Sequence, residues 1–324
     1  MQKLKPVKDK DVYHQAVYRE IKALLERILF FPVMAIAEEG SLDNAPSSAL
    51  ITALKKVELS YANDHFTGKF SAKIGLELRK LGASWDKGRK TYFLPEAKVP
   101  AEVKIAIARG RADTQNKINK IKEKLDSLQR DGAVPSIDFE RQVAGITMDL
   151  DQQFRTTIPK DIGLPMTQDA TMKEALRIGY TENLDYYIQK MTKESAQRLR
   201  EKVVEHVEQG GRAADLIPLI EAQHGVSKRH ALFLAKQETS ILVSTYRDAR
   251  YREAGVQEYV WSTSHDSRVR PDHKKLDGRR FKFNEPPVSD QAIGARNNPG
   301  YDYGCRCVAI PLLEGDAPVE YSKQ

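Results

Sequence analysis

The chain has 324 residues, of which 40% are apolar and 30% are charged, so its size allows about two domains. A formal net charge of +7 permits contact with nucleic acid or an acidic protein surface, although a solvated basic surface is the simpler explanation. The two cysteines argue against a disulfide framework, since thiols two positions apart bridge poorly. We therefore expect reduced thiols and a cytosolic birthplace, which excludes the class of small disulfide-stabilised secreted proteins.

The N-terminal part predicts two helices. Residues 11–38 place apolar side chains at helical spacing, and Pro32 is expected to break or kink this helix. The apolar run at 28–37 starts late and contains that proline, so we expect neither a signal peptide nor a membrane span. Residues 41–48 predict a linker, and a second helix is expected at 49–62.

Residues 63–110 differ from the helical sequence around them and predict a small α/β unit. A helix is expected to end at Gly82. The turn signal Asp86-Lys-Gly88 lies between short aromatic and β-branched runs, which predicts a hairpin over 83–94. Another helix opens at about residue 99. A unit this small must rest on its neighbours to be stable.

The sequence from 111 to 255 predicts a helical scaffold. One long amphipathic helix follows Thr171, although Ser195 occupies a slot on its apolar face where an apolar residue is expected. The other helices are expected at 111–130, 137–156, 213–223 and 228–254; Gly210-Gly211 ends the long helix, Ser227 caps the last one and Gly255 stops it.

Together these patterns predict an α+β protein, predominantly of long α-helices, with a small α/β insertion and a compact α+β C-terminal domain. The expected division is an N-terminal helical segment at 1–62, the insertion at 63–110, the scaffold at 111–255 and the terminal domain at 256–324.

The terminal domain contains the residue types that bind metals. In an extended chain, Cys305 and Cys307 point to the same face, and two thiolates with a histidine begin a tetrahedral zinc site. His273, or His265 together with Asp266, would complete it as a structural site. The spacing is one residue shorter than the usual Cys-x-x-Cys. The alternative is that both cysteines pack as small apolar groups while the histidines bond loops.

The same domain contains a basic run from Asp266 to Lys282, with seven basic residues and three aspartates. Phe281 and Phe283 lie among the last basic residues. This run can follow a phosphate backbone or face an acidic protein partner, and charge alone does not decide between them. The candidate binding residues are Arg268, Arg270, Lys274, Lys275, Arg279, Arg280 and Lys282.

Catalysis is a further alternative, because His265, Asp266, Arg268 and His273 are types that support phosphodiester cleavage by acid–base chemistry. However, no paired motif fixes a nucleophile or a base. The sequence has no Gly-rich phosphate loop, no Gly-x-Ser-x-Gly and no His-Glu-x-x-His. We therefore expect a protein that is not an enzyme.

An ordered series of motifs over residues 175–313 resembles the phage Mu protein F-like minor head proteins, the head morphogenesis proteins of tailed bacteriophages. The series runs from Tyr180-Thr-Glu-Asn183-Leu through Val226-Ser227, Ala231, Ala235 and Glu238 to Trp261, Asp266, Arg268, His273, Asp277-Gly278 and Cys305-Arg-Cys307.

The resemblance implies a structural virion protein, present in few copies inside the head near the portal and made in the host cytoplasm. It implies the portal protein as a partner, with the major capsid or scaffolding protein and packaged DNA as further ones, and no membrane. It implies no established catalytic role. Some relatives carry a toxin or enzyme domain after the Cys-Arg-Cys segment; here seventeen residues follow Cys307, so we expect none. The alternatives are a metal-dependent nuclease or RNase-like enzyme, and a DNA-binding assembly factor.

Overall fold

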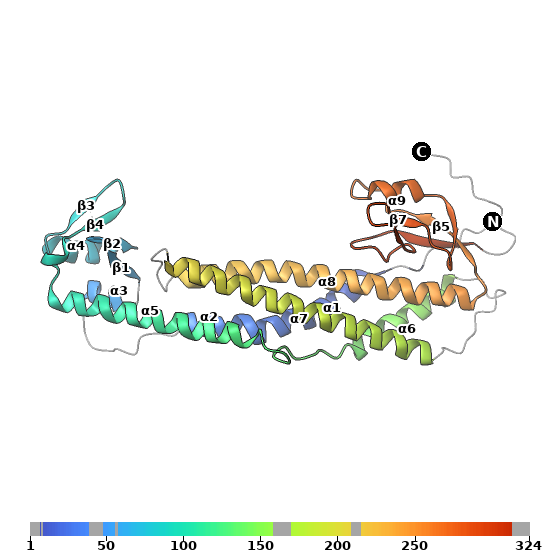
Figure 1. The fold of residues 1–324 in the computed structure, drawn as a ribbon, viewed down its shortest axis with the longest axis horizontal. Coiled ribbons are helices and arrows are strands. Elements are labelled where there is room, and N and C mark those ends of the chain that lie inside the picture. The colour runs from blue at the N-terminus through green and yellow to red at the C-terminus, as the bar shows by residue number, and fades with distance from the viewer. Residues whose placement is uncertain are drawn as a thin grey trace. The chain divides into compact units, whose positions relative to one another are not determined.

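The computed structural model describes residues 7, 9–38, 48–55, 58–157, 170–208 and 215–312. Helices dominate it and the strands form small sheets, so the expected α+β class is confirmed (Figure 1). The first half contains α1 (Asp11–Leu25), η1 (Glu26–Phe30), α2 (Phe31–Glu38), α3 (Ala49–Lys55), β1 (Leu59–Ala62), β2 (His65–Gly68), α4 (Ala72–Lys80), β3 (Ser84–Asp86), β4 (Thr91–Phe93), η2 (Glu96–Lys98), α5 (Ala101–Ser127) and α6 (Glu140–Thr157).

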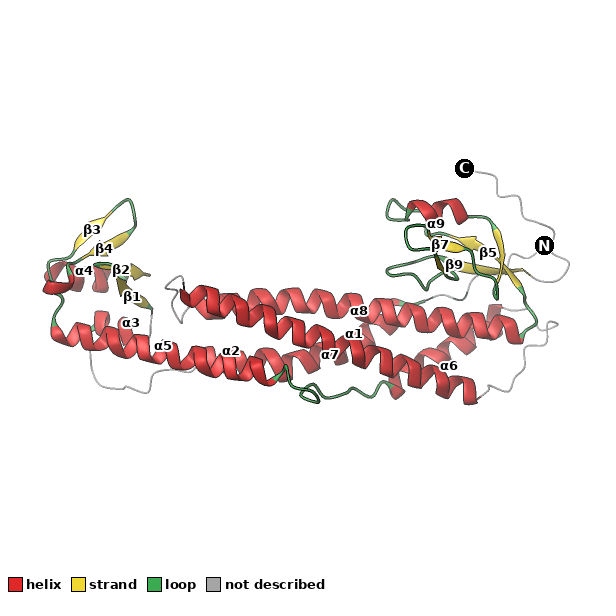
Figure 2. Ribbon diagram, viewed as in Figure 1, coloured by secondary structure: helices red, strands yellow, loops and turns green. Residues whose placement is uncertain are grey.

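The second half opens with the two longest helices of the described chain and ends in short strands (Figure 2). Its elements are α7 (Ala170–Glu208), α8 (Leu216–Glu253), β5 (Glu258–Ser262), α9 (Pro271–Leu276), β6 (Arg280–Lys282), β7 (Val288–Asp290), β8 (Ala295–Arg296) and β9 (Val308–Leu312). Within the described residues, every helix is too short or too polar to cross a membrane.

The chain divides into two compact units. Residues 1–22, 136–188 and 229–324 form the first, and residues 23–135 and 189–228 form the second. The helices α7 and α8 therefore contribute residues to both units.

The second unit contains a four-stranded antiparallel sheet in the order β1-β2-β4-β3. The expected hairpin at 83–94 is confirmed as β3 and β4. Its Asp86 Oδ1 accepts hydrogen bonds from the backbone N–H of Gly88 at 2.9 Å and of Arg89 at 3.0 Å, which fixes the turn. Side chains of the sheet, α3, α4 and the first turns of α5 share one apolar core.

The helix expected at 49–62 is corrected by the structure. It ends at Lys55, and Leu59–Ala62 is strand β1. Leu59 and Tyr61 alternate with more exposed neighbours, and the period of two places both in the core when β1 pairs with β2. The boundary expected between residues 62 and 63 therefore falls inside the β1–β2 hairpin.

Two other expected helix breaks are corrected. At Pro32 the chain stays helical, so the break is absent, and the irregularity there is the π-helical turn η1 just before the proline. The helices expected at 213–223 and 228–254 are one helix, α8. Pro218 lies in its first turn, where an N–H has no helical acceptor. Ser227 is therefore a buried interior residue rather than a cap.

Some expected features fall outside the described residues, namely most of the 41–48 linker and Gly210-Gly211. The long helix after Thr171 is confirmed as α7, and its apolar face is buried through Leu184, Ile188, Leu199 and Val203.

The terminal domain lies in the first unit and is built on a three-stranded sheet in the order β6-β5-β9. Its strands β5 and β9 form an antiparallel pair with Glu258 opposite Leu312 and Ser262 opposite Val308. Tyr259 and Trp261 are fully buried; the ring of Tyr259 packs 4.8 Å from Phe283, and that of Trp261 lies 5.4 Å from His273. This aromatic core supports the candidate site.

Candidate metal centre

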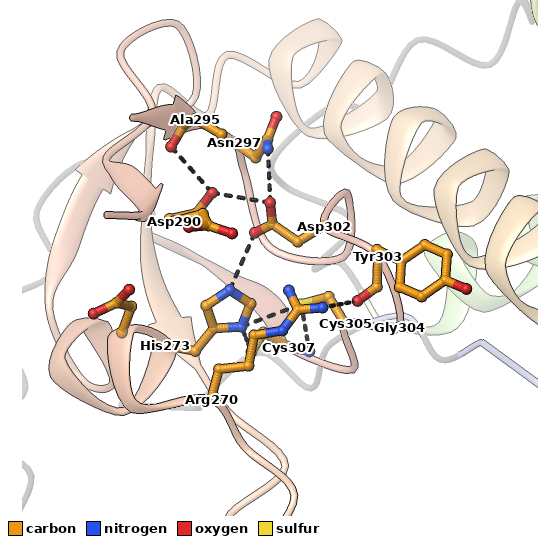
Figure 3. A network of polar contacts seen from close by, with 12 residues as sticks. Arg270, His273, Asp290, Ala295, Asn297, Asp302, Tyr303, Gly304, Cys305 and Cys307 are labelled. Atoms are coloured by element: carbon orange, nitrogen blue, oxygen red, sulfur yellow. Dashed lines mark hydrogen bonds and ion pairs between the residues drawn. The ribbon is translucent and has the colours of Figure 1, made fainter. Parts of the chain in front are cut away.

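His273, Cys305 and Cys307 meet in the interior of the terminal domain. Their ligand atoms all lie within 4.8 Å of one another, and all three residues are buried. The Nδ1 atom of His273 is 3.7 Å from Sγ of Cys305 and 3.5 Å from Sγ of Cys307. Figure 3 shows the imidazole pointing toward both cysteines. The structure therefore places the two cysteines together with a histidine, as the sequence pattern predicted.

Local structure brings these residues together. Pro271 begins α9, and its fixed φ suits the first helical position, so His273 lies on a single short helix. Trp261 of β5 packs beneath the imidazole. The backbone N–H of Cys305 donates to the carbonyl of Asp302 at 2.9 Å and closes a turn. Both cysteines follow this turn and lie just before β9.

A buried carboxylate, Asp302, holds the far side of the histidine ring. Its Oδ2 lies 3.1 Å from His273 Nε2. Its other oxygen accepts hydrogen bonds from Asn297 Nδ2 at 2.7 Å and Ser289 Oγ at 3.0 Å (Figure 3). Sequence reasoning missed Asp302, because no spacing rule connects it to His273, 29 positions earlier.

Hydrogen bonds within the group shift the pKa of each of its members. A hydrogen bond from the Cys307 thiol lowers the pKa of Cys305 to about 5, with a further contribution from His273. In return, Cys305 raises the pKa of Cys307. Asp302, followed by Cys305, raises the pKa of His273 to about 9. Burial opposes ionisation of Asp302, but hydrogen bonds from His273, Asn297 and Ser289 lower its pKa. Cys305 and His273 are therefore shifted toward their charged forms, and Cys307 toward its neutral thiol.

His265 and Asp266, the other expected ligands, lie outside this group. His265 has a left-handed φ of 54° and an exposed side chain whose Nδ1 is 3.5 Å from Asp277 Oδ2. Asp266 accepts hydrogen bonds from the Arg306 guanidinium, one of them at 2.8 Å, and these hold its pKa far below the usual range. Both border a shallow cavity of about 470 Å³.

Of the seven candidate binding residues of the basic run, four contact an acceptor in the same domain, and for the other three no ion pair is described. Three of them contact carboxylates of the same domain: Arg268 with Asp266, Lys275 with Asp272, and Arg280 with Glu258. Arg270 donates to the backbone carbonyl of Tyr303. Among the described residues, no ion pair is found for Lys274, Arg279 or Lys282, and Arg279 lies 5.6 Å from the Phe281 ring centre. Part of the positive charge is therefore neutralised inside the domain.

The loop at residues 297–307, between β8 and β9, carries both cysteines and is called the ligand loop. It rests on helix α8. The backbone N–H of Gly304 donates to Oε1 of Gln237. At Gly300, where φ is +96°, an added Cβ would lie 2.1 Å from Ser244 Oγ. Only glycine permits this approach, so the loop that carries the cysteines is fitted closely against α8.

Comparison with known proteins identifies the region around the site. Residues 197–310 match the family model described as phage Mu protein F like protein. A Haemophilus influenzae protein described as an uncharacterized protein is 31% identical over 122 residues, 38% of this chain and 26% of the relative. The chain thus spans about a quarter of the length of this curated relative. No solved structure was found to match. This stretch, from the later turns of α7 to β9 and including the group of His273, Cys305 and Cys307, is therefore similar to phage Mu protein F like protein.

Proposed function

We propose that this chain is a structural minor head protein of a tailed bacteriophage, and that it acts in head morphogenesis by docking on the portal. The observation that carries the proposal is the family match over residues 197–310, which contain all of α8 and most of the terminal domain. In this proposal the protein resides in the virion, inside the head near the portal.

The way the terminal domain is mounted supports a docking role. Its ligand loop is fixed on α8 through Gln237 and the glycine contact at Ser244. Tyr259 of β5 donates to Asn298 Oδ1 at 3.0 Å, which ties the sheet to the same loop. A surface built this way needs little ordering when a partner binds, which favours affinity.

An exposed aromatic pair marks the surface that we assign to the portal. The rings of Phe233, on α8, and Tyr303, on the ligand loop, lie 4.5 Å apart and remain 37% and 67% exposed. Large aromatic side chains supply much of the binding energy at protein interfaces. This pair also belongs to the matched region.

Retention on immobilised portal oligomers of the same phage tests the proposal. We expect the full chain to be retained, and the double variant Phe233→Ala, Tyr303→Ala to lose at least about tenfold in affinity. The matched control is Tyr186→Ala, Tyr187→Ala, a second exposed pair (61% and 39%) outside the matched region, which should bind as wild type. Wild-type chain that the portal does not retain contradicts the docking role. A Phe233/Tyr303 variant that binds normally contradicts the assigned surface.

A further inference from the structure

We propose that His273, Cys305 and Cys307 bind a structural zinc ion and that Asp302 positions the histidine for it. In a tetrahedral site with Zn–S near 2.3 Å and Zn–N near 2.0 Å, sulfur and nitrogen ligands are about 3.6 Å apart. The observed separations between His273 Nδ1 and the two sulfurs are 3.7 and 3.5 Å. Both nitrogen–sulfur separations thus suit one shared ion, and the two sulfurs lie within 4.8 Å of each other.

The donor types select the metal. Two thiolates and one imidazole suit zinc, whereas magnesium and calcium prefer oxygen ligands. Zinc stays in one oxidation state and stabilises small, loop-rich domains. The described residues supply three protein donors rather than the four of a closed structural site, so a water molecule would take the fourth position.

Asp302 acts through the histidine rather than on the metal. Because it accepts a hydrogen bond from Nε2 of His273, the lone pair of the neutral ring lies on Nδ1, the atom that faces both sulfurs. Asn297 and Ser289 hold the carboxylate in turn. A carboxylate behind a ligating histidine fixes the ring and strengthens it as a donor.

The ion would join two segments that are otherwise distant in sequence. His273 lies on α9, whereas Cys305 and Cys307 lie on the loop that rests on α8 through Gln237. A bound ion would therefore link α9 to the loop that contacts α8. Loss of the ion should loosen that loop before it affects the β5–β9 pair, whose five registered positions do not depend on the ligands.

Metal analysis of the purified full chain, followed by cobalt substitution, tests the site. We expect about one zinc per chain, and a cobalt form whose thiolate-to-metal absorption disappears in the Cys305→Ser, Cys307→Ser variant and in His273→Ala. His265→Ala is the matched control and should keep both the zinc and the spectrum. Zinc-free protein that shows no thiolate absorption with cobalt overturns the proposal, as does metal that survives all three ligand changes.

A second measurement does not depend on whether the variants fold. Wild-type protein treated with a chelator should unfold at a lower temperature, and zinc but not magnesium should restore the original value. An unchanged unfolding temperature after complete zinc removal would overturn the structural role.

Chelator competition separates the positioning role of Asp302 from general destabilisation. Asp302→Asn should keep the cobalt spectrum but weaken zinc affinity by about 10- to 100-fold. Asp290→Asn, at a neighbouring carboxylate that bonds the Ala292 N–H at 3.0 Å, should leave the affinity unchanged. Equal affinities in both variants contradict the assignment. All these tests use the isolated chain, so they can fail while portal docking stands, and the reverse.

Discussion

At the scale of single residues, the first unit contains buried carboxyl groups with opposite roles. Asp151 is paired: it accepts a hydrogen bond from Tyr246 at 2.5 Å and lies 3.1 Å from the Lys173 ammonium. Asp248 is buried too, but desolvation outweighs the nearby charge of Arg247 and raises its pKa to about 6. The fold therefore holds a proton on Asp248 more tightly than the unfolded chain does.

This difference predicts a pH dependence of stability. The folded pKa of about 6 exceeds the ordinary aspartate value of 3.8, so the contribution of Asp248 is fully present below about pH 4 and is lost as pH rises through 6. The loss is on the order of 3 kcal/mol, at 1.36 kcal/mol per pKa unit. In chemical denaturation from pH 4 to 7, the wild type should lose stability relative to Asp248→Asn. A constant difference between the two proteins would contradict this.

The candidate site shows what the sequence can predict at this scale. Residue type and the period of two were enough to group Cys305, Cys307 and a histidine. Asp302 could not be found, because its contact with His273 depends on the path of the loop between β8 and β9, which no local pattern encodes. Ser195 looked like a fault in an apolar face. Its partner is Ser227, buried on α8 with its Oγ 3.0 Å away, and that pairing exists only in the folded chain.

At the scale of elements, the long helices were predicted well and their ends less well. Apolar spacing predicted α7, and Gly255 correctly predicted the end of α8. The sequence suggested a break or kink at Pro32, where the structure has a π turn, and a break between residues 223 and 228, where α8 continues. Strand β1 was mistaken for helix because its four residues are too few to show a period of two. The apolar run before it has helical spacing and suggested that the helix continues.

Two glycines on helices of the first unit give a matched prediction. Gly255 closes α8 with a φ of +79°, and no atom would contact an added Cβ, so Gly255→Ala should destabilise only through backbone strain, by about 1 kcal/mol or more. Gly145 lies exposed inside α6, also with open space, so Gly145→Ala should stabilise by about 0.5–1 kcal/mol.

Urea denaturation of both glycine variants beside the wild type measures these changes. Shifts of the same sign in the two variants would show that helix propensity and the left-handed conformation do not control stability here.

At the scale of the whole molecule, the family match covers one part of a longer architecture. It begins within α7 and ends in β9, while the sheet of β1 to β4 lies outside it. The proposed docking surface and the proposed zinc site both lie in the matched part. The basic run, which the sequence left open between DNA and a protein partner, is partly neutralised by Asp266, Asp272 and Glu258.

The most direct test is quantitative mass spectrometry of purified, nuclease-treated heads of the phage that encodes this chain. Our account predicts that the chain is present, at a small fraction of the amount of the major capsid protein. It also predicts that the chain is depleted from heads when Phe233 and Tyr303 are both replaced by alanine. A chain that is abundant in the lysate yet absent from wild-type heads would contradict the central claim that it is a head protein.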